Sequence, residues 1–360
     1  MTTSRERLLA TLAFRPADRA PFGVGIGWFP WWQTLLRWRE ESGMADLDPA
    51  MALGYDDGFA VAPLEYGPCP LFEPCEISRT DRYIVTRNRY GVHVRNLLDN
   101  SSMPEFIAHP LKTVDDWRHY KEERLFPAWE DRLRQVPAFA EDARAHGQAV
   151  QFGTYPFGVF GTVRELFGAE ETLFLFYDEP DLVHDVMSTH VTLWIELARR
   201  VQAMIPIDHW HIWEDMSGKQ GSLISMAMVE EFMMPQYDRI AAFCREHRIP
   251  VLSVDTDGRV DELVAVMTRH GVTMMFPFEQ QCGNDIERFR DEYPTLAIMG
   301  GLDKNALADG PAAIRRELDT AERMLARGGY VPGCDHLIPP NVAWNTWKQF
   351  CRDLRTIVGA

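Results

Sequence analysis

Long hydrophobic runs and an excess of positive charge are both missing from this sequence. No stretch approaches the roughly 20 consecutive apolar residues that span a bilayer. The chain has 37 Lys and Arg residues against 53 Asp and Glu residues, a formal net charge of −16 at pH 7. Such a charge disfavours nonspecific binding to nucleic acid or anionic lipid, although a local basic pocket for a polyanionic substrate stays open. We therefore expect a small-molecule substrate and no nucleic-acid or membrane partner.

Cysteine is scarce, with six residues in 360. Cys69 and Cys75 have five residues between them, which is not the two-residue spacing of a zinc knuckle or a redox motif. Apart from Cys334, these thiols are interpreted as reduced structural residues, as is usual in the cytosol. The apolar run at residues 8–13 is too short and too amphipathic for a secretory signal. We expect a cytoplasmic protein.

Two common catalytic signatures are also absent. No glycine-rich phosphate loop follows a predicted strand, and no Ser-His-Asp signature is found. Nucleotide-dependent and acyl-transfer chemistry therefore have little support from the sequence.

What the chain does contain is a regular alternation of helix-like and strand-like segments. At 360 residues and 46% hydrophobic content it has the length of one large α/β barrel and enough apolar residues for its core. We predict a single (β/α)8 TIM-barrel domain over residues 1–360. The predicted helices span residues 4–15, 182–204 and 225–246, and the predicted strands span residues 20–27, 148–153, 209–215 and 250–255.

Residues 58–108 have a different pattern. Residues 82–94 alternate as paired strands do, around a turn that contains Asn88 and Gly91. We interpret residues 58–108 as an antiparallel β insertion after the first βα unit, and not as a separate domain.

The last third of the chain carries four acidic or thiol-bearing clusters, each just after a short apolar run. In a (β/α)8 barrel the chemistry lies at the C-terminal ends of the strands, where the βα loops converge. These clusters therefore predict an active site at that end of the barrel. They are Asp255-Thr256-Asp257-Gly258, Phe278-Glu279, Leu302-Asp303-Lys304 and Cys334-Asp335-His336.

An earlier strand, residues 209–215, also ends in acid. Consecutive Glu214 and Asp215 cannot both face the same way if the strand continues, and Asp215 is favoured for the site. His209 and His211 alternate to one face of the strand, where a hydrogen-bonded core pair is more common than a metal site.

Aromatic residues follow two of the early strands. They predict a substrate-binding wall at the mouth of the barrel, and ordinary rim packing is the alternative. The aromatic candidates are Trp28, Trp31, Tyr155 and Phe157.

Several stretches resemble the uroporphyrinogen decarboxylase superfamily. The resemblance covers nearly the whole chain except the insertion and implies a (β/α)8 barrel with its site at the C-terminal mouth. Residues 213–225 are similar to a motif of the methyltransferase-like branches. The other matching stretches are residues 5–12, 16–21, 255–258, 278–279, 300–304 and 335–340.

The resemblance favours one branch of the superfamily. True decarboxylases carry an Arg-Gln-Ala-Gly-Arg run near the N-terminus that grips substrate carboxylates, whereas residues 27–33 here are aromatic and uncharged. The chain therefore resembles the methyltransferase-like branch, of the corrinoid-linked O-demethylase type, more than a true uroporphyrinogen decarboxylase.

The same resemblance implies a possible metal site. Zinc-dependent relatives bind their metal through a His-x-Cys pair at a strand end and a distant Cys. Here Asp255 and Asp257 occupy the place of that pair, Glu279 follows at a matching interval, and Cys334 stands in the place of the distant Cys. This set predicts zinc, a harder divalent ion or no metal at all. In the simplest alternative, the aspartates cap the following helix.

The predicted chemistry is removal of a methyl group from a small methoxylated aromatic substrate. The departing oxygen must be neutralised by a Lewis acid or a general acid. Closely spaced carboxylates suit this task, because their repulsion raises the pKa of one of them. Asp215, Asp255 and His336 are the catalytic candidates, and Asp303 is expected to line the mouth and bind substrate.

The methyl acceptor implied by the resemblance is a corrinoid protein. The chain contains no corrinoid-binding domain of its own, so a partner protein is expected to supply the corrinoid. The alternatives are a decarboxylase-type lyase acting on a carboxylated substrate, and a barrel that binds a ligand without catalysis. In that last case the acids of the mouth should all be engaged with backbone amides.

Overall fold

Seven parallel strands form the main sheet of the computed structural model, which describes residues 2–100 and 103–360. The strands follow one another around a curled sheet in chain order, as successive βα units do. They are β1 (Phe59–Val61), β6 (Ala149–Phe152), β7 (His209–Trp213), β10 (Val251–Asp255), β11 (Met274–Phe276), β12 (Ala297–Met299) and β13 (Tyr330–Val331).

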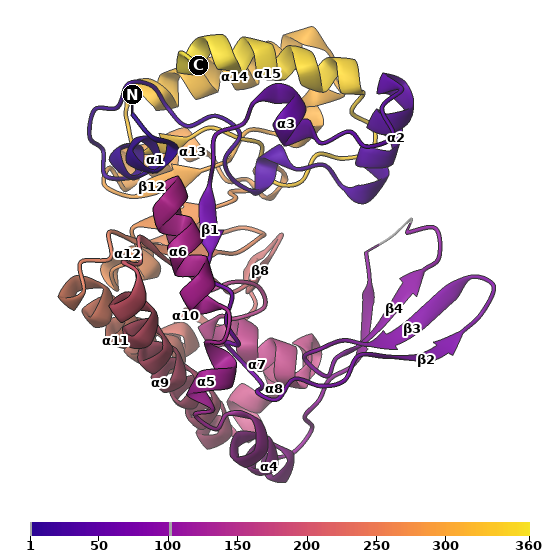
Figure 1. Cartoon of the computed structure of the whole chain (residues 1–360), viewed down its shortest axis with the longest axis vertical. Coiled ribbons are helices and arrows are strands. Elements are labelled where there is room, and N and C mark those ends of the chain that lie inside the picture. The colour runs from indigo at the N-terminus through magenta and orange to yellow at the C-terminus, as the bar shows by residue number, and fades with distance from the viewer. Residues whose placement is uncertain (1, 101–102) are drawn as a thin grey trace.

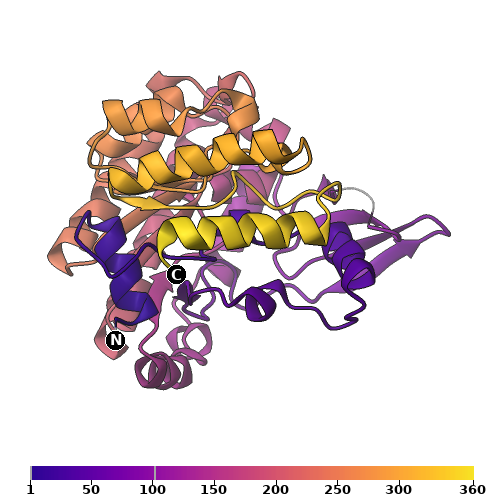
Figure 2. The same cartoon turned by 90° about the horizontal axis from the view of Figure 1, so that it is seen from above.

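Helices cover the outer face of this sheet, and both chain termini lie at the same end of the molecule (Figure 1, Figure 2). The helix predicted at residues 225–246 is interrupted by one π-helical turn, η2 (Val229–Met233). The α-helices are α1 (Ser4–Leu12), α2 (Trp32–Ser42), α3 (Pro49–Leu53), α4 (Val114–Arg124), α5 (Trp129–Arg132), α6 (Val136–His146), α7 (Val159–Phe167), α8 (Ala169–Asp178), α9 (Pro180–Met204), α10 (Met226–Met228), α11 (Met234–Glu246), α12 (Asp261–Arg269), α13 (Ile286–Glu292), α14 (Pro311–Ala326) and α15 (Trp344–Val358).

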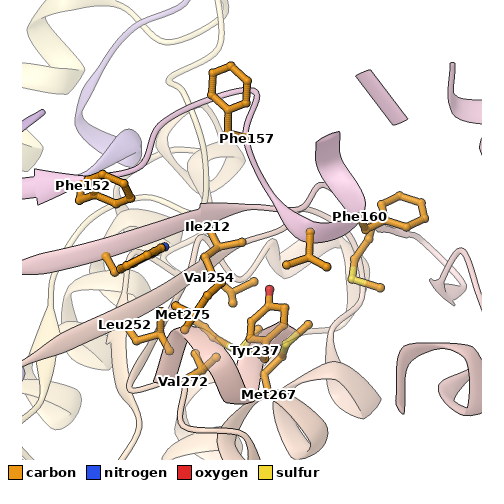
Figure 3. Close-up of a cluster of buried hydrophobic side chains, with 14 of the residues drawn as sticks. Phe152, Phe157, Phe160, Ile212, Tyr237, Leu252, Val254, Met267, Val272 and Met275 are labelled. Carbon is orange, nitrogen blue, oxygen red and sulfur yellow. The ribbon is translucent and has the colours of Figure 1, made fainter. Parts of the chain in front are cut away.

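The strands alternate between two cores. Leu252 and Val254 of β10 point outward and pack with residues of the covering helices such as Tyr237 (Figure 3). Val251 belongs to a second cluster on the inner face of the curled sheet. Because side chains alternate along a strand, Asp255 faces the inside with Val251. The period-2 pattern therefore places a carboxyl group on the inner face at the last residue of β10.

Helix α1 closes the N-terminal end of the sheet. It begins with a capping box in which Thr3 and Glu6 satisfy each other's backbone N–H groups. The Arg5 guanidinium then binds both carboxylate oxygens of Asp208, just before β7, at 3.0 and 2.7 Å. The opposite, C-terminal end of the strands is left for the site.

The strand predicted at residues 20–27 is not present. This segment forms an irregular turn followed by the 3-10 helix η1 (Ile26–Trp28). Two of its glycines are required. A Cβ at Gly27 would lie 1.9 Å from the carbonyl oxygen of Cys334, and Gly25 has a φ of 103°, which favours glycine. Just after this segment, an isolated bridge pairs Pro30 with Ile338 in the chain after β13. The observed sheet therefore has seven strands in the described residues, and the eight-stranded closure that we predicted is not seen.

An antiparallel sheet lies between β1 and β6 in the chain and stands away from the body (Figure 1). The predicted turn at Asn88 and Gly91 joins β3 to β4. The range 58–108 began too early, because residues 59–61 form β1 and pair with β6 in the parallel sheet. The four strands are β2 (Cys75–Arg79), β3 (Tyr83–Arg87), β4 (His93–Leu97) and β5 (Glu105–Ala108).

Smaller elements complete the description. In the described residues, no helix is both long and apolar enough to cross a membrane. The short elements are the ribbon β8 (Ser217–Gly218) and β9 (Gly221–Ser222) and the 3-10 turns η3 (Gln280–Cys282) and η4 (Lys304–Leu307).

Candidate active site

A cavity of about 930 Å³ opens at the C-terminal ends of the strands and runs outward between α7, α8 and the end of the antiparallel sheet. Apolar and aromatic side chains form much of its wall, including Phe106, Phe167, Tyr155 and Trp213. Its ionisable lining residues are His109, Lys112, Arg164, Glu165, Glu170, Glu171, Asp215, Asp255, Asp257 and His336.

Backbone pairing brings the acidic residues of two neighbouring strands together. Trp213 at the end of β7 is in register with Asp255 at the end of β10. The carbonyl of Asp255 accepts the amide N–H of Glu214 at 2.9 Å and that of Asp215 at 3.4 Å. Asp215 has a φ of 41°, in the left-handed region, and its side chain lines the cavity. The two strand ends thus place Asp215, Asp255 and Asp257 around one space.

The carboxyl group of Asp255 has a shifted pKa. Burial, together with the charges of Asp257 and Asp215, raises the pKa of its carboxyl group well above the usual range. No hydrogen bond to its side chain offsets these effects among the described residues. A carboxyl group in this environment favours its protonated form.

His336 lies opposite Asp257 in the same cavity. Its Nε2 atom is 3.6 Å from Oδ2 of Asp257, and its ring stacks on Trp31 with centroids 6.0 Å apart. Burial of the imidazole disfavours its charged form, but the nearby carboxylate of Asp257 outweighs burial and raises the pKa of His336. His336 can therefore carry a proton at the mouth.

We expect the pKa of His336 to fall when Asp257 is replaced by Asn, because burial is then opposed by less negative charge. NMR titration of the imidazole in the wild type and in Asp257→Asn measures this directly. The raised pKa also means that the pair stabilises the fold below about pH 6.5 and that this contribution is lost as pH rises through the folded-state pKa. An equal pKa in both proteins would contradict the pairing, and Asp303→Asn serves as the control.

Asp215 is joined to helix α7 by Arg164, whose guanidinium binds both its carboxylate and its backbone carbonyl. Burial raises the pKa of Asp215 although Arg164 opposes the shift. Its neighbour Glu214 points the other way and is fully buried. The two consecutive acids therefore face apart, and it is Asp215 that lies at the cavity.

Glu214 fixes the start of α7. Its carboxylate accepts the backbone N–H groups of Val159, Phe160 and Gly161 at 3.0, 2.7 and 3.0 Å and the hydroxyl of Tyr237 at 2.5 Å. These are N–H groups that a helix N-terminus leaves unpaired. Glu214 thereby holds the helix that carries Arg164 and Glu165 against the end of β7.

Glu279 belongs to a neighbouring network that does not line the cavity. Its carboxylate accepts the N–H of Gly258 at 3.0 Å and lies 3.3 Å from Nζ of Lys304. The same Nζ atom is 3.3 Å from Asp335, which is fully buried and accepts the N–H of Gln280 at 2.8 Å. Asp335 belongs to one of the four predicted clusters, but its pairing with Lys304 was not predicted from the sequence. This network anchors the loops beneath His336.

The structure does not assemble the predicted four-residue metal set. Cys334 is fully buried in the hydrophobic core, where burial raises the pKa of its thiol well above the usual range, and it does not line the cavity. Glu279 is held by Gly258 and Lys304. Within residues 2–100 and 103–360, no three His, Cys, Asp or Glu side chains gather as ligands for a metal ion. The residues present therefore do not fit a metal ion, and no chemical step is assigned to one.

The predicted aromatic wall is only partly correct. Trp28 is fully buried, and its indole N–H donates to the carbonyl of Pro332 at 2.7 Å. Phe157 is also buried, between Tyr66 and Tyr90, and neither of these two predicted substrate-binding residues lines the cavity.

Tyr155 does line the cavity, packed edge-on against Trp213. Trp31 reaches the site through its stacking on His336. Asp303, which was expected to bind substrate, does not line the cavity and instead caps η4 by accepting the N–H of Asn305 at 2.8 Å.

The buried histidine pair is a core element. The Ser253 hydroxyl bridges His209 Nε2 at 2.6 Å and His211 Nδ1 at 3.1 Å. Burial lowers the pKa of His211 to about 4, so this ring is neutral at neutral pH.

Several lining residues were missed. Trp213 was considered from the sequence only within the motif at residues 213–225. Its position at the end of a predicted strand could have indicated that it lines the cavity, and the structure places it in register with Asp255. Arg164, Glu165 and His109 come from helix and loop segments whose sequences have no strand-end pattern.

Comparison with known proteins agrees with this architecture. The model of the uroporphyrinogen decarboxylase (URO-D) family matches residues 85–356, and the chain belongs to this family. A methyltransferase from Methanosarcina mazei has a similar structure, with a TM-score of 0.63, 16% sequence identity and 99% of each chain covered. At that identity the similarity shows the fold alone. No curated protein sequence matches the chain.

Proposed function

We propose that the protein is a methyltransferase that removes the methyl group of a small methoxylated aromatic compound and passes it to a corrinoid protein. The observation that carries the proposal is Asp255, an acid with a strongly raised pKa on the inner floor of a partly aromatic cavity. Membership of the uroporphyrinogen decarboxylase family and the fold shared with a methyltransferase support it.

The reaction requires a proton at the ether oxygen. The acceptor attacks the methyl carbon, the carbon–oxygen bond breaks, and the oxygen keeps the bonding electron pair. Asp255 donates its proton to this oxygen, so the product leaves as a neutral phenol and Asp255 is left as a carboxylate. His336, which lines the same cavity, then passes a proton from solvent to Asp255. A reduced corrinoid, brought by a partner protein, supplies a nucleophile strong enough for an unactivated methyl group.

The charge of the cavity disfavours the alternative, a decarboxylase-type lyase acting on a carboxylated substrate. Among the described residues, Arg164 and Lys112 are the Arg and Lys side chains that line it, and Arg164 is already bound to Asp215. Six carboxyl groups share the same lining. Such a site favours a neutral or cationic substrate.

The second alternative, a barrel that only binds a ligand, requires mouth acids engaged with backbone amides. Burial and neighbouring charges raise the pKa of Asp255. Among the described residues, no group donates a hydrogen bond to its side chain. The partner of Asp257 in the described residues is His336. These acids are thus left for chemistry.

A direct test incubates the purified protein under anoxic conditions with methoxylated benzenes and chemically reduced cobalamin as the acceptor. We expect the phenol and methylcobalamin to form in equal amounts. Chromatography measures the phenol, and visible absorption measures methylcobalamin. A reaction without protein is the blank. Carbon dioxide release from carboxylated analogues, with no methyl transfer, would instead support the lyase.

A further inference from the structure

The outer end of the cavity contains a second polar group that the proposed reaction does not use. Glu165, on α7, lies there with His109, which follows β5. Apolar side chains surround the two residues, including Ile107, Leu111 and Leu175. Polar atoms in an apolar wall are expected to have partners.

Glu165 lacks such a partner. Glu165 is 9% exposed, and its Oε1 atom is buried with no hydrogen-bond partner among the described residues. The adjacent Arg164 is directed to Asp215 and does not bind it. A buried carboxyl group without a partner destabilises the fold, and a bound ligand that supplies a donor can offset this cost.

The neighbouring histidine defines which chemistry this end can bind. The Nδ1 atom of His109 lies 2.8 Å from the backbone carbonyl of Glu165. A carbonyl oxygen only accepts, so Nδ1 carries the hydrogen and the Nε2 atom of the neutral ring is an acceptor. Glu165 and His109 therefore both offer acceptors to the cavity.

The surrounding charge has the same preference. Glu170 and Glu171, in the first turn of α8, line this part of the cavity. Among the described residues, Lys112 is the lysine that lines the cavity. A group that brings N–H donors and a positive charge complements both the acceptors and the acidic lining.

We propose that Glu165 and His109 form a subsite that binds a primary ammonium group on the end of the substrate opposite its methoxy group. This inference rests on the proposed function and narrows its substrate class to methoxylated aromatic amines. Glu165 is then a specificity-determining residue that does not touch the reacting atoms.

A proton-release signature accompanies such binding. Burial raises the pKa of Glu165 to about 7, so a large fraction is protonated at neutral pH without ligand. An ammonium group favours the carboxylate, and binding should therefore release protons at pH 7.

The test measures binding of two matched probes, 4-methoxybenzylamine and 4-methoxybenzyl alcohol, to the full chain by calorimetry in buffers of different ionisation enthalpy. We expect the wild type to bind the amine at least about tenfold more tightly than the alcohol, with proton release. Glu165→Gln keeps the size of the side chain and removes its negative charge, so the preference for the amine over the alcohol should be lost. Glu179→Gln, an exposed acid outside the cavity, is the matched control.

Three results overturn the subsite: equal affinity for both probes, an amine preference that survives Glu165→Gln, or no amine binding at millimolar concentration. Turnover assays with the same probes separate this inference from the proposed function. An amine preference without methyl transfer leaves the subsite standing and contradicts the methyltransferase. Methyl transfer with no preference for the amine over the alcohol supports the methyltransferase and overturns the subsite.

Discussion

Asp255→Asn should lower the rate constant for methyl transfer, kcat, by about 10³-fold, because the amide cannot donate the proton that the leaving oxygen needs. The substitution keeps the size of the side chain and removes an acid whose charged form is disfavoured by burial. We therefore expect the thermal stability to stay the same or to rise. In the wild type, kcat should fall as pH rises through the pKa of Asp255, since the acid form is required.

Asp303→Asn is the matched control for this prediction. It makes the same chemical change after β12, two strands from β10 in the sheet, at a carboxylate that caps η4 outside the cavity. Asn is about as good a cap as Asp, so both activity and stability should be retained. A fully active Asp255→Asn protein would exclude Asp255 as the general acid.

Glu214→Ala should destabilise the fold more than any other substitution considered, by about 3–5 kcal/mol. It leaves three backbone N–H groups of α7 and the hydroxyl of Tyr237 buried without their acceptor. Chemical denaturation followed by far-UV circular dichroism measures the change in the free energy of unfolding.

The control for this substitution is Glu231→Ala, which removes an exposed carboxylate from η2. Its effect should stay within about 0.5 kcal/mol. A Glu214→Ala protein as stable as this control would contradict the anchoring role of Glu214 at the start of α7.

Much of the fold was predictable because strand periodicity and strand-end chemistry are local signals. The strand at 250–255 and the acids that follow it have this form, and the structure places β10 at Val251–Asp255. The first strand was not found correctly, because β1 has three residues and lies inside a stretch that resembled the antiparallel sheet. The glycines of residues 20–27 instead permit close packing against the loop after β13.

The site was predictable only where the residues follow strands. Asp215, Asp255, Asp257, Tyr155 and His336 line the cavity as their positions after strands suggested. Trp28, at the end of η1, and Cys334, after β13, are also near the site, but their side chains turn into the core, and composition does not specify that direction. Glu165 lies within a helix, where an acid has the pattern of an ordinary surface residue. Its isolation depends on Arg164 being bound to Asp215, a tertiary contact.

The protonation state of Asp255 at neutral pH tests the central claim most directly. Infrared difference spectroscopy between the wild type and Asp255→Asn at pH 7 isolates the absorption of this one carboxyl group. We predict the C=O band of a protonated carboxylic acid in the wild type, lost in the variant and retained in Asp303→Asn. A carboxylate band in its place would show that Asp255 has no proton to donate, and would contradict the proposed mechanism.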